Sequence, residues 1–242
     1  MTLAPLTAAA LTVKVFADGG DLADIRDVAR NPLVQGFTTN PTLMRKAGVA
    51  DYRAFAQEVI AQIGNRPISF EVFSDDFDDM ERQALEIASW GENVYVKIPV
   101  TDCQRGSAEK LVTSLAEQDV KVNVTALMTL EQVRTMTQCL AGGPGAYVSV
   151  FAGRIADTGR DPVPVMAAAV ALAEEYRNVE VIWASPREVL NVVQADAIGC
   201  HVITVTHDVL RKLTALGKDL GQFSLETVQM FRDDAVAAGY RL

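Results

Sequence analysis

The chain has 242 residues, of which 49% are hydrophobic and 22% charged, ordinary values for a soluble globular protein. Its 22 basic and 31 acidic residues give a formal net charge of −9 without long blocks of one sign, which argues against nucleic acid or an anionic membrane as a partner. Three widely spaced cysteines and two histidines argue against a disulfide framework and a zinc site.

The first segment, 3–12, is mildly apolar but lacks the basic stretch of a signal peptide. No apolar run in the chain approaches the roughly 20 residues of a membrane span. We therefore expect a cytoplasmic chain whose cysteines are reduced.

Short β-rich runs alternate with amphipathic stretches along the whole chain. We expect strands at 13–18, 36–40, 68–73, 94–98, 121–127, 147–151, 179–185 and 202–206. We expect helices at 51–63, after Ser74, at 107–117, 129–140, 162–176 and 186–198, with a last helix at about 224–239. Repeated β-then-α units indicate parallel strands, and the simplest closed arrangement is a single (β/α)8 barrel domain, 1–242, with an extra C-terminal helix.

An open, doubly wound α/β sheet is the alternative fold. No G-x-G-x-x-G motif follows the first strand and no P-loop pattern is present, which argues against it. The last helix has Leu225, Val228 and Phe231 on one face, so it could cap the barrel or dock on another subunit.

Strand parity separates apolar from polar side chains. In the run 94–98, Val94, Val96 and Ile98 share one face and Tyr95 and Lys97 share the other. The aliphatic faces suit the helix layer, so the polar faces must point into the barrel. The polar side chains lie late in their strands, at the barrel end that carries active sites; they are Asp18, Thr38, Asn40, Glu71, Lys97, Asn123, Thr125, Ser149 and Ser185.

Lys97 lies at the centre of the apolar run VYVKIPV. Burial of an ammonium group is costly, and a lowered pKa is one way to reduce that cost while making the amine nucleophilic. A structural ion pair with Glu71 or Asp18 is the alternative. Asn123 and Ser149 taken singly are compatible with satisfied interior polar residues, and Asp18 with a turn before Gly19.

Six motifs together resemble the transaldolase family, including its smaller members close to fructose-6-phosphate aldolase. They are ADGGD (17–21), TTNPT (38–42), VYVKIPVT (94–101), VNVTAL (122–127), SVFAGRIAD (149–157) and WASPRE (183–188). The resemblance covers essentially the whole chain. It implies a class I aldolase barrel that transfers a dihydroxyacetone unit from a ketose phosphate to an aldose phosphate, without a metal or organic cofactor.

The resemblance also implies a role for each matching residue. Lys97 falls on the Schiff-base lysine and Asp18 on the acid/base aspartate, while Glu71 and Thr125 match the pair that positions a water molecule. Residues expected to bind substrate are Thr38, Asn40, Asn123, Ser149, Phe151, Arg154, Ser185 and Arg187. Arg154, and Ser185 with Arg187, match phosphate-binding positions, and guanidinium groups suit a phosphate well. They would supply the local positive charge that an acidic protein needs to bind an anion.

Three positions distinguish transfer from simple cleavage. The fructose-6-phosphate aldolases of the family have glutamine at the position of Glu71 and tyrosine at that of Phe151. They lack an asparagine matching Asn123. All three positions here favour transaldolase, with aldolase activity as the alternative. The segment after Ser185 is shorter than usual, so Arg187 could be displaced and a non-standard anionic sugar could be the substrate.

Two further hypotheses stay open. The chain could be an inactive barrel that serves as a binding or assembly protein, although Lys97, Asp18 and Glu71 argue against this. His207, just after the last strand, could contribute to the substrate region or be merely structural.

Overall fold

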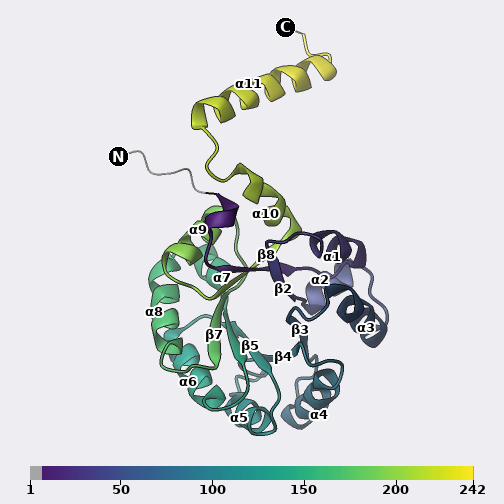
Figure 1. Ribbon diagram of the computed structural model, residues 1–242, viewed down its shortest axis with the longest axis vertical. Helices are drawn as coiled ribbons and strands as arrows, with labels where there is room; N and C mark the ends of the chain where they lie inside the picture. Colours follow the sequence, from purple (N-terminus) through teal and green to yellow (C-terminus); the bar gives the residue numbers. More distant parts are fainter. Residues whose placement is uncertain (1–6, 242) are drawn as a thin grey trace.

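The computed structural model describes residues 7–241 and contains a closed barrel of eight parallel strands surrounded by helices (Figure 1). Each strand pairs with the next, and β8 pairs with β1 to close the barrel. The strands are β1 (Lys14–Asp18), β2 (Val34–Thr38), β3 (Ile68–Glu71), β4 (Val94–Pro99), β5 (Val122–Leu127), β6 (Ala146–Val150), β7 (Val179–Trp183) and β8 (Val202–Thr206). The expected (β/α)8 barrel is confirmed, and the open sheet is excluded.

Helices follow each strand and cover the outside of the barrel (Figure 1). They are α1 (Leu22–Val28), α2 (Pro41–Lys46), α3 (Tyr52–Ile63), α4 (Phe77–Ala88), α5 (Glu109–Glu117), α6 (Leu130–Leu140), α7 (Ala152–Asp157), α8 (Val163–Ala173), α9 (Leu190–Ala197) and α10 (His207–Lys212). A last helix, α11 (Leu220–Ala237), lies apart from this layer (Figure 1). Short 3₁₀ segments lie at Ala8–Ala10 and Leu213–Ala215. The side chains of Asp51, Asp76 and Thr129 accept backbone N–H bonds at the starts of α3, α4 and α6, which explains why these helices begin there.

The apolar side chains form two separate clusters on the two sides of the sheet. The larger lies between strands and helices and contains the aliphatic face predicted for β4, namely Val94, Val96 and Ile98. The smaller contains Phe16 and Tyr147, whose rings meet edge to face at 5.7 Å between centroids. Phe16 also lies so close to Gly36 that a Cβ there would be 2.5 Å from its ring. This packing inside the barrel confirms the predicted strand parity.

Several strands end earlier than expected, at points where the backbone turns toward a site or a helix. The run 36–40 is shifted to Val34–Thr38, because Asn40 leaves the strand and caps α2 through Leu43 N. The third strand ends at Glu71, and the side chain of Gln83 then accepts the N–H of Phe73. The seventh ends at Trp183, shortly before Ser185, whose φ of +60° is left-handed.

Helix α11 extends away from the barrel (Figure 1). It starts at Leu220, four residues before the expected boundary, because the Asp219 side chain accepts the N–H of Gln222 and caps the helix there. None of its residues is buried, so it does not cap its own barrel. Between residues 7 and 241 no helix combines the length and the apolar character that crossing a bilayer would require.

Candidate active site

A cavity of about 520 Å³ opens at the carboxyl ends of the strands. Its lining includes Asp18, Thr38, Asn40, Glu71, Lys97, Thr125, Ser149, Phe151, Arg154, Ser185 and Arg187. Every residue predicted for the site is therefore in its wall, with the exception of Asn123. Parallel strands bring these side chains together because their carboxyl ends share one rim of the barrel.

Lys97 lies on β4 with only 6% of its surface exposed. Its Nζ donates a hydrogen bond to the backbone oxygen of Thr39 at 2.9 Å and lies 3.6 Å from Glu71 Oε2. The Thr39 oxygen is well fixed, since the Thr39 hydroxyl donates to Ser69 O at 3.0 Å. The amine is thus held in the cavity wall by one carbonyl and one carboxylate, which includes the ion pair considered as a structural alternative.

Asp18, at the end of β1, is half-buried and accepts two side-chain hydrogen bonds. Thr38 Oγ1 donates to its Oδ1 at 2.8 Å, and Asn40 Nδ2 approaches its Oδ2 at 3.4 Å. Burial raises the pKa of the Asp18 carboxyl, and the charge of Lys97 together with these two hydrogen bonds opposes the rise. A carboxyl with a raised pKa can both accept and return a proton.

Glu71, at the end of β3, has its backbone fixed by Tyr52 of α3. The Tyr52 hydroxyl donates to Glu71 O and accepts from Glu71 N, both at 2.8 Å. Burial raises the pKa of the Glu71 carboxyl, Lys97 lowers it, and the negative charge of Asp18 adds to the rise. Two carboxyl groups therefore share the single buried ammonium of Lys97 in this wall.

A chain of buried polar side chains runs beside Lys97. Asn123 Nδ2 donates to Ser69 Oγ at 2.9 Å, and Ser149 Oγ donates to Asn123 Oδ1 at 2.7 Å. Asn123 is fully buried and lies behind the cavity wall, where it holds Ser149. Thr125 differs, since its buried hydroxyl has no hydrogen-bond partner within residues 7–241 although it faces the cavity. A buried hydroxyl in that state needs a bound water or ligand atom.

The backbone is left-handed at two points of the rim. Ala126 has φ of +65° beside a register shift in β5, and Ser185 has φ of +60°. Non-glycine residues adopt this conformation at a cost of about 1–3 kcal/mol, and such positions cluster at functional sites. Both residues line the cavity.

Two arginines, Arg154 and Arg187, line the cavity. Arg187 lies two residues after Ser185, and its backbone N–H donates to Asn191 Oδ1 at 2.7 Å. Its side chain forms a two-point ion pair with Asp157 on α7, in which Nε donates to Oδ1 at 3.1 Å and Nη2 contacts Oδ2. The short segment after Ser185 therefore does bring Arg187 to the cavity.

Two of the residues that sequence reasoning missed bear on the site, Thr204 in the cavity wall and Asp157 beside it. Thr204 lines the cavity, and its hydroxyl lies 2.6 Å from that of Thr38; the parity of the run 202–206 could have identified it. Asp157 is the last residue of the SVFAGRIAD motif, and no local pattern indicates its contact with Arg187. His207 does not line the cavity: its Nδ1 lies 3.1 Å from Asp24 Oδ1 on α1.

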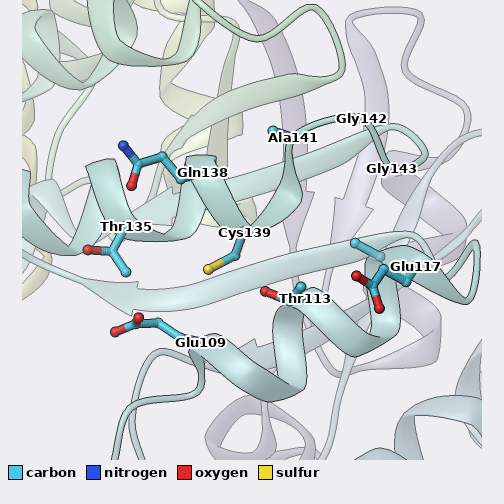
Figure 2. A pocket seen from close by; sticks show the side chains of 10 residues that line it. Glu109, Thr113, Glu117, Thr135, Gln138, Cys139, Ala141, Gly142 and Gly143 are labelled. Carbon is cyan, nitrogen blue, oxygen red and sulfur yellow. The ribbon is translucent and has the colours of Figure 1, made fainter.

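A second hollow, of about 380 Å³, lies outside the barrel between α5 and α6. Figure 2 shows Glu109, Thr113 and Glu117 on one side of it and Gln138 and Cys139 on the other. None of the residues predicted for the site lines it. Within 7–241, no group of three or more His, Cys, Asp and Glu side chains is arranged to hold a metal ion.

The chain is similar to known proteins in sequence and in fold. The family model described as Transaldolase/Fructose-6-phosphate aldolase matches residues 15–241. A probable transaldolase of Thermoanaerobacter sp. is 34% identical over 233 residues, covering 95% of this chain and 100% of the relative. A probable transaldolase of Dehalococcoides mccartyi is 33% identical over 202 residues, covering 83% and 90% of the two chains.

Among solved structures, a Burkholderia cenocepacia J2315 protein with a provisional phosphonomutase name superposes with a TM-score of 0.57. It is 14% identical, and the match covers 85% of this chain and 93% of that one. At this identity the likeness shows a shared fold and carries no functional information.

Proposed function

The chain belongs to the transaldolase/fructose-6-phosphate aldolase family, and on that premise we propose that it is a transaldolase that works through a Schiff base on Lys97. The single observation that carries the proposal is the position of Lys97, buried in the cavity wall with Glu71 and near Asp18. Its donor would be fructose 6-phosphate or sedoheptulose 7-phosphate, and its acceptor an aldose phosphate.

In the first step the Lys97 amine attacks the ketose carbonyl to form a carbinolamine, which loses water and becomes an iminium. The Glu71 carboxyl would protonate the carbinolamine hydroxyl, which leaves as water, and Glu71 and Thr125 would hold that water; this accounts for the unpartnered Thr125 hydroxyl in the wall. The raised pKa of the Glu71 carboxyl suits a group that must supply a proton near neutral pH.

Carbon–carbon cleavage follows from the iminium. Asp18 takes the proton of the C4 hydroxyl, the C3–C4 bond breaks, and its electron pair moves toward the iminium to form an enamine. The aldose phosphate leaves and a second aldose phosphate enters. The enamine attacks its aldehyde carbon while Asp18 returns the proton, and hydrolysis of the new iminium restores the free Lys97 amine.

Retention of the three-carbon unit is favoured by Phe151. Phe151 lines the cavity and has no hydroxyl group, so it cannot supply a proton to the enamine. Protonation of the enamine would release free dihydroxyacetone, which is the aldolase outcome. We propose that Arg154 and Arg187 bind the phosphate end, and that Thr38, Asn40 and Ser149 bind sugar hydroxyls, with Asn123 holding Ser149.

The test supplies fructose 6-phosphate with and without erythrose 4-phosphate, and follows glyceraldehyde 3-phosphate and free dihydroxyacetone separately. A transaldolase yields glyceraldehyde 3-phosphate only when the acceptor is present, and no free dihydroxyacetone. Both products without acceptor would show an aldolase. Borohydride should trap an adduct on Lys97 in the native chain and none in Lys97→Met; absence of an adduct with every ketose phosphate would favour a non-catalytic barrel.

We also propose that α11 packs on a second copy of this chain. Its exposed apolar side chains are Leu220, Phe223, Leu225, Val228, Met230, Phe231 and Val236. None of these side chains is buried on the barrel of the same chain. An exposed apolar surface of this kind is typical of a protein–protein interface. The barrel offers other exposed apolar side chains to receive it, namely Phe73, Leu85, Met128 and Leu190.

Gel filtration with light scattering tests this proposal. Phe231→Asp should lower the native mass, and Phe231→Leu, which keeps an apolar side chain, should not. A chain ending at Lys218, just before the helix cap, should behave like Phe231→Asp. An unchanged mass in both disrupted forms would exclude α11 as the interface.

A further inference from the structure

The most informative contact outside the reacting centre is the ion pair between Arg187 and Asp157. The two partners come from different segments, the loop after β7 and the last residue of α7, and they meet side by side through two contacts. Arg187 lines the cavity, whereas Asp157 does not. The carboxylate therefore holds the guanidinium from outside the substrate space.

The geometry leaves the guanidinium able to bind a second anion. A guanidinium has five N–H donors, and the contacts to Asp157 engage only Nε and Nη2. Three donors stay available, and a planar fork with several free N–H groups suits the oxygens of a tetrahedral anion. Asp157 thus orders Arg187 without using up its donors.

The local charge balance stays positive despite the carboxylate. Arg154 lines the same cavity and is close enough to Asp157 to lower the pKa of its carboxyl, so two guanidinium groups accompany this one carboxylate. The hydrogen bond from Arg187 and the charges of Arg187 and Arg154 lower the pKa of the Asp157 carboxyl, which keeps it ionised at neutral pH.

The backbone around the pair supports the same arrangement. A Cβ on Gly153 would lie 1.5 Å from Ser185 O and 3.3 Å from Arg187 Nε, so the loop after β7 packs directly on α7. Asn191 fixes the Arg187 N–H from α9. Backbone and side chain of Arg187 are therefore anchored at separate points.

We propose that Asp157 is a positioning residue that holds Arg187 ready for an oxyanion at the far end of the substrate. This inference rests on the proposed function, in which Arg187 contacts the phosphate. A free arginine side chain has many rotamers and loses them on binding; an arginine already ordered by Asp157 loses few. Asp157 would accordingly lower the cost of binding the anionic end and leave the chemistry at Lys97 untouched.

Asp157 could affect Arg187 in two opposite ways, and the direction in which its removal changes phosphate binding decides between them. If Asp157 orders Arg187, its removal weakens anion binding. If Asp157 instead masks Arg187 or repels the anion, its removal strengthens binding. Calorimetry with inorganic phosphate on the full chain measures this directly, and it requires no turnover.

We expect Asp157→Asn to weaken phosphate binding about 5- to 10-fold. Arg187→Gln should weaken it at least as much, and adding Asp157→Asn to Arg187→Gln should cause no further loss, because Asp157 acts through Arg187. The matched control is Glu58→Gln, which removes a comparably exposed pair with Arg26 between α1 and α3 and should leave phosphate binding unchanged.

Steady-state kinetics provide a second readout. Asp157→Asn should raise the KM for fructose 6-phosphate by a similar factor and change kcat less than twofold. Tighter phosphate binding by Asp157→Asn, further loss in the Arg187→Gln background, or no phosphate binding by the native chain would each overturn the inference. A missing Lys97 adduct would instead refute the proposed function, so the two failures are distinguishable.

Discussion

The backbones of α7 and of the loop after β7 approach each other closely at Gly153, which allows a sharp prediction for Gly153→Ala. The added Cβ would lie 1.5 Å from Ser185 O and 2.7 Å from Ser185 C, whereas real Cβ contacts stay beyond 3.0 Å. The two segments must therefore move apart by about 1.5 Å. Neither atom is the end of a flexible side chain, so the loop itself has to shift and Arg187 shifts with it.

The cost appears in both stability and activity. Overpacking of this kind costs about 1–3 kcal/mol, and each kcal/mol lowers the melting temperature by about 2–4 °C in a chain of this size. A displacement above 1 Å at a substrate-positioning residue can reduce kcat/KM about 100-fold. We expect a loss of about 10- to 100-fold for fructose 6-phosphate, mostly as a higher KM.

Thermal melts by circular dichroism and initial-rate kinetics test both parts. The control is Gly19→Ala, where the added Cβ would meet only Ile25 Cγ1 at an ordinary 3.8 Å and stability should be retained. A Gly153→Ala protein that melts within 1 °C of the native chain and keeps kcat/KM within about twofold would refute the reasoning.

Three further predictions concern the buried polar groups. Burial raises the pKa of Asp18, so the stability that its protonated form gives is lost as the pH rises through the pKa of the folded protein. Asp18→Asn should therefore unfold at a higher urea concentration than the native chain at pH 7, and the difference should shrink toward pH 4. An equal difference at both pH values would contradict this. Thr125→Val should not lower the urea midpoint, because it removes an unpartnered hydroxyl. It should slow the formation of the borohydride-trapped adduct about 10-fold in single-turnover assays, and native trapping rates would exclude a role for the hydroxyl. Asn123→Ala should lower the free energy of unfolding by about 2–4 kcal/mol in urea titrations, because the hydroxyls of Ser69 and Ser149 lose their partner; a loss below about 1 kcal/mol would show that water replaces the amide.

Much of the barrel and most of the cavity wall follow from local pattern. The β-then-α units have strict periodicities, and alternation along a strand assigns Val94, Val96 and Ile98 to the helix side and Lys97 to the interior. That alternation is a property of the extended backbone and needs no knowledge of neighbours. Placement at the strand ends then brings Asp18, Glu71 and Lys97 to one rim, as predicted.

The bonds that hold these side chains depend on contacts between distant segments. Lys97 is held by the carbonyl of Thr39, 58 positions away, which only the register of neighbouring strands and the turn after β2 can bring near. Asn123 shares the inward face of β5 with Thr125, but its deeper position in the barrel puts it behind the wall. Parity sets the direction of a side chain and says nothing of its depth.

The sequence by itself determined the alternation of strands and helices, the inward face of each strand and the identity of the polar residues at the rim, because these depend on backbone geometry repeated every few residues. Only the tertiary structure decided that Asp157 pairs with Arg187, that the backbone of Ser185 packs directly on Gly153, and that α11 extends away from the barrel. The physical reason is that such contacts depend on the relative placement of segments 30 or more residues apart, which packing of the whole barrel sets to within an ångström.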